Sequence, residues 1–68
     1  MFTEEEKRFL IHITQWRFDE TVRHIGKMDK IIEDQSSTDR DIEWAQNHIQ
    51  QDYEKMAMYN SIVAKLEQ

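Results

Sequence analysis

The chain has 68 residues and a formal charge of −5; 38% of its residues are hydrophobic, none is cysteine or proline, and only Gly26 is glycine. A chain this short buries about 60% of the surface that its unfolded form exposes, so it forms at most one core and relies on a disulfide, a metal or a partner for stability. The absence of cysteine excludes disulfides and cysteine nucleophiles. The lack of proline and the single glycine argue against β-hairpins and phosphate-binding loops. The acidic charge disfavours direct binding to nucleic acid.

Nothing in the chain predicts secretion or association with a membrane. No apolar run approaches the roughly 20 residues that cross a bilayer. The chain begins Met1-Phe2-Thr3 without the basic region of a signal peptide. We therefore expect a cytoplasmic protein that binds neither membranes nor nucleic acid directly.

The first helix is predicted over about residues 4–33. Thr3 followed three residues later by Glu6 is a capping box, and glutamates in the first turn suit the positive end of the helix dipole. Large apolar residues then recur every seven positions, and two further ones fill the same face. These residues are Ile11, Phe18, Ile25 and Ile32, joined by Val22 and Met28. Gly26 lies inside this run, where it indicates either a close helix contact or a position that tolerates glycine.

A loop is predicted at about residues 34–38, followed by a second helix over about residues 39–67. The loop segment contains no large apolar residue, and it offers Thr38 with Asp41, or Asp39 alone, as the N-cap. The second helix again has apolar residues seven apart, with others three residues after three of them, which is the pattern of a coiled-coil seam. These residues are Ile42, Ile49, Met56 and Val63, with Ala45, Tyr59 and Leu66.

The two apolar stripes match when the chain folds back near residue 37. Folding there brings residue 11 beside 63, 18 beside 56, 25 beside 49 and 32 beside 42. The predicted fold is therefore all-α, a long antiparallel helical hairpin of two helices that forms a single domain over residues 1–68. Because two helices bury only one stripe each, we expect two hairpins to assemble into a four-helix bundle homodimer.

The apolar residues exceed what one seam buries, and the surplus gathers at the open end of the hairpin. Three bulky residues share the side of the first helix away from the seam, one lies between the two sides, and two fall off the seam of the second helix. We predict that all six form an interface, either with a second copy or with the apolar groove of another protein, and that Trp16 is its hot spot. They are Phe9, Ile13 and Trp16, then Leu10, then Met58 and Ile62.

Polar residues interrupt the seam at Thr14, Thr21 and Asp52. A polar residue in a seam can set the register of the two helices, but a buried carboxylate without a partner is costly. We therefore predict a slight rotation of the second helix that places Tyr53 inside and leaves Asp52 in water.

Trp44 lies off the predicted seam, near the loop. Two interpretations remain open for it. It is either a second interface anchor or a lid over Met28 and Ile31.

Two pairs of residues have the spacing to reach one metal ion from a helix. Glu20 and His24 are four apart, as are His48 and Asp52. Metal sites in helical bundles generally use Glu-x-x-His, with three-residue spacing, and neither pair has it. We therefore predict no metal site and no cofactor.

No arrangement of residues in the chain predicts catalysis. Ser36 and Ser37 lie in the loop without a neighbouring base, and no glycine-rich turn is present to build an oxyanion hole. A helical hairpin also lacks a deep concave pocket of its own. We therefore expect a protein that is not an enzyme.

Two functional hypotheses follow. The first is a non-enzymatic protein–protein interaction module, a self-associating hairpin that regulates or scaffolds a partner protein. The alternative is a small acidic inhibitor that blocks the basic channel of a nucleic-acid-processing enzyme by phosphate mimicry, and salt separates the two because it screens only the second. The acidic residues of that alternative are Glu4, Glu5, Glu6, Asp39, Asp41 and Glu43.

Overall fold

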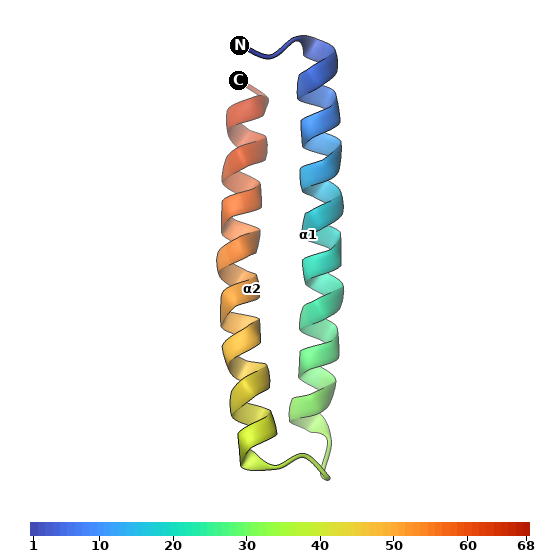
Figure 1. Cartoon of the computed structure of the whole chain (residues 1–68), viewed down its shortest axis with the longest axis vertical. Helices are drawn as coiled ribbons and strands as arrows, with labels where there is room; N and C mark the ends of the chain where they lie inside the picture. The colour runs from blue at the N-terminus through green and yellow to red at the C-terminus, as the bar shows by residue number, and fades with distance from the viewer.

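The chain folds into two antiparallel α-helices joined by a short loop. The computed structural model describes all 68 residues, with α1 over Glu4–Glu33, α2 over Asp39–Leu66 and no β-strand. The helices lie side by side with both termini at the same end (Figure 1), within an envelope of 51 × 14 × 11 Å. The predicted all-α hairpin is confirmed. Neither helix contains a segment long and apolar enough to cross a membrane.

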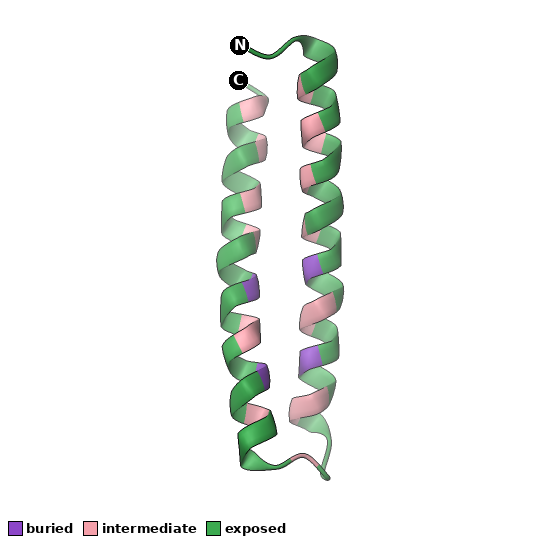
Figure 2. Ribbon diagram, in the orientation of Figure 1, coloured by how far each residue is buried: buried purple, intermediate pink, exposed green.

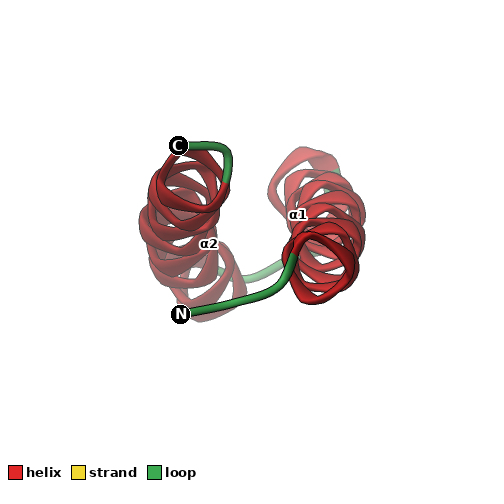
Figure 3. Ribbon diagram, turned by 90° about the horizontal axis from the view of Figure 1, so that it is seen from above, coloured by secondary structure: helices red, strands yellow, loops and turns green.

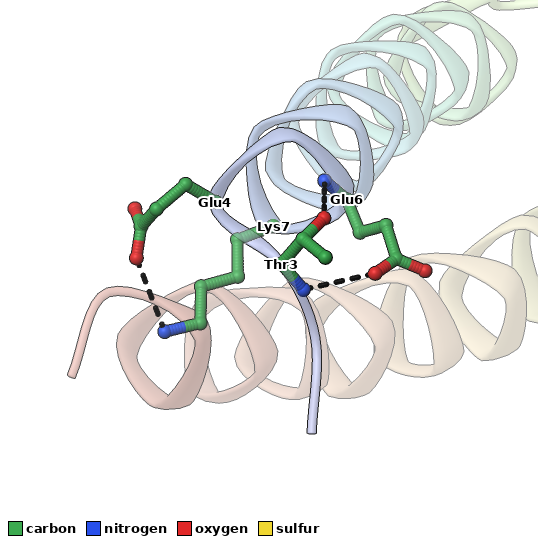
Figure 4. A network of polar contacts seen from close by, with 4 residues as sticks. All are labelled: Thr3, Glu4, Glu6 and Lys7. Atoms are coloured by element: carbon green, nitrogen blue, oxygen red, sulfur yellow. Dashed lines mark hydrogen bonds and ion pairs between the residues drawn. The ribbon is translucent and has the colours of Figure 1, made fainter.

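Each helix begins at a capping box. Thr3 Oγ1 accepts a hydrogen bond from the Glu6 N–H at 3.1 Å, and Glu6 Oε1 accepts one from the Thr3 N–H at 2.9 Å (Figure 4). Thr38 and Asp41 make the same reciprocal pair at the start of α2, at 3.2 and 3.1 Å, so Thr38 is the N-cap and not Asp39. These bonds satisfy backbone N–H groups that have no partner inside the helix, and such caps contribute about 1 kcal/mol each.

The helices end at the loop and at the C-terminus. Asp34 caps α1, and its Oδ1 accepts hydrogen bonds from the Ser36 N–H at 2.9 Å and the Ser36 hydroxyl at 2.7 Å. These two bonds, the backbone one foremost, hold the pKa of Asp34 below its usual range. The helix α2 ends at Leu66, one residue before the predicted end, and the N–H of its cap residue Glu67 donates to the Val63 carbonyl at 3.0 Å.

The capping box of α1 predicts a dependence of stability on acid. The hydrogen bond from the Thr3 backbone, followed by that from its side chain, lowers the pKa of Glu6. A carboxyl whose pKa is lowered by folding adds stability above its unfolded pKa and loses it as the pH falls through the folded pKa. In urea titrations, the wild type is expected to lose more stability on acidification than Glu6→Gln. Glu5→Gln is the control, because Glu5 takes no part in the box, and an equal loss in all three proteins contradicts the prediction.

The core of the hairpin is small and lies away from the open end. Only four residues are buried, and Figure 2 shows them on the facing sides of the two helices, in the part nearer the loop. Ala45 is completely covered and faces the larger Met28, which is 6% exposed. Thr21 and Asp52 form the other buried layer, and the hydroxyl of Thr21 donates to the Arg17 carbonyl at 2.9 Å. The half of the hairpin that carries the termini has no buried residue.

The seam does not rotate at Asp52, and the prediction of a rotation is wrong. Asp52 is 4% exposed, whereas Tyr53 is 56% exposed. His24 of α1 donates from Nδ1 to Oδ2 of Asp52 at 2.5 Å, which supplies the partner that a buried carboxylate requires. Val22, which we predicted on the seam face, is 46% exposed because the seam row passes through Thr21 instead.

Gly26 is a tolerated residue and makes no close helix contact. A Cβ atom added at this position meets no atom within 4 Å, and the residue lies on the exposed side of α1. Because alanine favours helix over glycine, Gly26→Ala is expected to raise the free energy of unfolding by about 1 kcal/mol. Urea denaturation monitored by circular dichroism measures this change. A loss of stability in this variant contradicts the open environment of the position.

Candidate interaction face

Five of the six side chains predicted to form an interface are exposed in the single hairpin. The two helices lie in one layer, with no further element over either broad side (Figure 3). All six lie in the half of the hairpin that carries the termini, which has no buried residue. The exposed fractions are 63% for Phe9, 53% for Trp16, 51% for Met58, 38% for Ile13 and 37% for Ile62, and Leu10 is half-buried.

A shallow polar groove crosses the middle of the hairpin on one broad side, with a volume of about 270 Å³. His24 is central to it, because its ring is hydrogen-bonded to Asp52 and lies edge-on to the ring of His48, with 5.7 Å between centroids. Arg17 and Lys55 line the same groove from the two helices, and neither has an acidic partner within the hairpin. The groove therefore presents two unpaired cations to an incoming surface.

The groove residues mark one face of the hairpin, which we call the histidine face. In a coiled-coil helix, residues seven positions apart lie on the same side, two turns from each other. Each groove residue therefore belongs to a row of residues, spaced by seven, that extends toward both ends of its helix. On α1 these rows are Leu10, Arg17, His24 and Ile31, and Glu6, Ile13, Glu20 and Lys27. On α2 they are Asp41, His48, Lys55 and Ile62, and Trp44, Gln51, Met58 and Lys65. Four of the six predicted interface residues thus lie on the histidine face.

The remaining two predicted interface residues lie just beside this face. Phe9 and Trp16 form a row on the outside of α1, and the row continues toward the loop with Arg23 and Lys30. The guanidinium of Arg17 lies 5.6 Å from the centre of a Trp16 ring, a cation–π distance. Trp16 is therefore held at the edge of the histidine face, with its ring partly exposed.

The histidine face is nearly neutral on an acidic protein. Its rows carry four basic residues against three acidic ones, although the chain as a whole has a charge of −5. The opposite broad side has a second open groove, lined on its polar part by Gln15, Asp19, Asn60 and Glu67. Two copies of the chain consequently meet the least repulsion when they approach through their histidine faces.

The contacts of His24 run across the two helices, to Asp52 and His48. Glu20 forms an ion pair with Arg23 at 2.7 Å, while His24 bonds to Asp52, so neither of the two pairs with metal-binding spacing is joined by a hydrogen bond. The chain contains no group of three or more histidine, cysteine or acidic side chains arranged to hold a metal ion. The bond between His24 and Asp52 was not predicted from the sequence. A signal for it was present, because placing residue 25 beside residue 49 also brings residue 24 close to residues 48 and 52.

Trp44 lies on the histidine face near the loop and is 49% exposed. Its ring packs against His48, with 4.3 Å between centroids and a tilt of 53°. This contact orients the exposed part of the indole ring on the same face as the groove. Of the two interpretations that the sequence left open, the geometry favours an interface anchor.

The acidic residues of the alternative hypothesis are split between the two ends of the molecule. Glu4, Glu5 and Glu6 lie at the start of α1, and the other three lie at the start of α2, at the far end of a hairpin 51 Å long. Glu6 and Asp41 are also engaged in capping boxes. The six residues therefore do not form one continuous acidic surface.

Comparisons of the chain with protein-family models, with curated proteins and with solved structures found no match. Its function is accordingly inferred from its own residues.

Proposed function

We propose that this chain is a non-enzymatic protein–protein interaction module, a helical hairpin that self-associates into a four-helix homodimer and regulates or scaffolds a partner protein. The exposed surface of the single hairpin carries the proposal. Its total is 5673 Å², whereas a compact monomer of 8.3 kDa exposes about 4,600 Å². The excess of about 1,100 Å² is slightly more than each partner buries in a standard interface.

The location of the apolar side chains supports a second copy of the chain as the partner that buries this excess surface. The histidine face has exposed apolar residues toward both of its ends, and its near-neutral charge lets two acidic chains approach. In a two-fold symmetric dimer, both subunits use the same surface patch, so one face of the hairpin is enough to form the interface. The opposite, more polar side remains accessible for the partner protein.

Sedimentation velocity over a range of micromolar concentrations tests the self-association. We expect a species of twice the 8.3 kDa chain mass, with a sedimentation profile that changes little as salt is raised, because the contact is mainly apolar. A monomer at all these concentrations contradicts the proposal.

A pull-down from the native host separates the interaction module from the acidic inhibitor. An affinity-tagged chain is expected to retain a protein partner in high salt. Binding to a nucleic-acid-processing enzyme that is lost steeply with rising salt favours the inhibitor instead, because exposed charge pairs are screened over about 10 Å at 0.1 M salt. Trp16→Ala, run in parallel, shows whether the captured protein depends on the exposed tryptophan.

A further inference from the structure

The side opposite the histidine face has a shallow groove in the half of the hairpin that carries the termini, which we call the terminal groove. Its volume is about 460 Å³, and both helices line it. Its floor is apolar, because Phe18, Tyr59 and Val63 lie along the seam between the helices and are only half-buried. No residue in this half of the hairpin is buried, so the hairpin by itself leaves the floor incompletely covered.

The polar groups of the terminal groove divide between its floor and its rim. At the floor, the Thr14 hydroxyl donates to the Leu10 carbonyl at 2.7 Å, so it needs no hydrogen-bond partner from a ligand. At the rim, Asp19 on α1 and Glu67 at the end of α2 are exposed, and neither carboxylate forms an ion pair within the hairpin. The terminal groove therefore presents an apolar strip between two unpaired carboxylates.

The charges on this side of the hairpin are predominantly negative. The rim of the terminal groove belongs to rows of residues spaced by seven, which run through Gln15 and Asp19 on α1 and through Asn60 and Ala64 on α2. These rows contain seven acidic residues and one basic residue, all exposed, so this side accounts for the acidic excess of the chain. The acidic residues are Glu5, Asp19, Asp29, Glu33, Asp39, Glu43 and Glu67, and the basic residue is Arg8.

We propose that the terminal groove binds a basic amphipathic helix of the partner protein; this inference rests on the proposed role of the chain as an interaction module. A third helix that lies along α1 and α2 places one apolar stripe over Phe18, Tyr59 and Val63. Lysine or arginine residues on the two sides of that stripe then face Asp19 and Glu67.

Charge complementarity favours this partner over a second copy of the chain. Two copies joined through this side bring two strongly acidic surfaces together, whereas the charges of the histidine face are nearly balanced. An acidic helix is repelled in the same way, and a basic helix without an apolar stripe leaves the floor of the terminal groove uncovered. The partner helix therefore needs both features.

Fluorescence anisotropy with three labelled synthetic peptides tests the proposal. Each peptide has about 20 residues, enough for a helix about 30 Å long. The first has an apolar stripe at helical spacing flanked by lysine and arginine, the second has the same stripe flanked by glutamate, and the third has the composition of the first in scrambled order. We expect the first to bind the full chain more than about tenfold tighter than either of the others.

The other results overturn the proposal in different ways. Equal binding of the scrambled peptide means that charge alone is recognised, and equal binding of the glutamate peptide means that apolar contact alone is recognised. Binding by none of the three peptides also overturns it.

Charge reversal at the rim locates the binding site. Asp19→Lys is expected to weaken binding of the first peptide about fivefold, because it replaces an attraction with a repulsion at an exposed position. Glu54→Lys is the matched control, since it makes the same change of charge at an exposed residue that does not line the terminal groove. Equal weakening in both variants means that the peptide responds to overall charge, which overturns the assigned site.

Sedimentation with and without the first peptide separates this inference from the proposed function. We expect the dimer to remain intact with the peptide bound, because the terminal groove and the histidine face lie on opposite sides. Conversion of the dimer to monomers by the peptide means that a second copy occupies the terminal groove, which overturns the inference and leaves self-association standing. A monomeric mass without peptide overturns the proposed homodimer, whether or not the peptide binds.

Discussion

Replacing Trp16 with alanine is expected to raise the dissociation constant of the proposed homodimer about 30-fold, which corresponds to about 2 kcal/mol. The Trp16 side chain is 53% exposed in the single hairpin, so removing it costs little stability unless a second chain covers the ring. Trp16 lies beside Arg17 at the edge of the histidine face, the surface proposed to bind a second hairpin. Sedimentation equilibrium of the two proteins measures the change directly.

Val22→Ala is the matched control for this substitution. Val22 is also apolar and 46% exposed, but it lies on the opposite side of α1 from the histidine face. We expect its dissociation constant to stay within a factor of about two of the wild type, as is usual for surface positions. An equal loss in both variants means that association depends on overall hydrophobicity and not on this face. No loss in Trp16→Ala contradicts its role as the hot spot.

Replacing His24 with alanine is expected to lower the free energy of unfolding by about 2 kcal/mol. The substitution leaves the Asp52 carboxylate, which is 4% exposed, without the side chain that donates to it at 2.5 Å. The effect falls below the 3–5 kcal/mol of a fully buried pair because the His24 side chain is itself 39% exposed. Urea denaturation at a fixed protein concentration provides the measurement.

Two variants make this prediction specific. His12→Ala removes an exposed histidine from the same helix and is expected to change stability by less than about 0.5 kcal/mol. Asp52→Leu replaces the buried carboxylate with an apolar residue that suits a seam position, so it is expected to be neutral or stabilising. A large loss of stability in Asp52→Leu and none in His24→Ala contradicts the role assigned to the bond.

The local elements of the fold were predictable because their signals lie within a few residues of one another. Thr3 and Glu6, and Thr38 and Asp41, are each three apart, so both helix starts could be located before any packing was known. The recurrence of apolar residues every seven positions likewise predicted which sides of the two helices face each other. The end of α2 at Leu66 was less certain, because it depends on how far the last turn frays.

The candidate interface was predictable only in part. Large side chains such as Phe9 and Met58 were singled out because they fall off the seam, and the structure places them in the half of the hairpin without a buried core. The polar centre of the face was not foreseen. Arg17 and Lys55 are far apart in the sequence, and only the antiparallel packing of the helices places them in one groove.

The sequence by itself determined the two helices, their caps and the apolar seam between them, because each of these follows from side-chain chemistry repeated at helical spacing. Only the tertiary structure decided that Asp52 is buried and that a histidine face exists. The bond between His24 and Asp52 joins residues 28 positions apart, and its geometry depends on the rotation of both helices about their axes. The apolar pattern does not decide whether Asp52 or the next residue, Tyr53, faces α1. The hydrogen bond from His24 across the seam requires Asp52 to face α1.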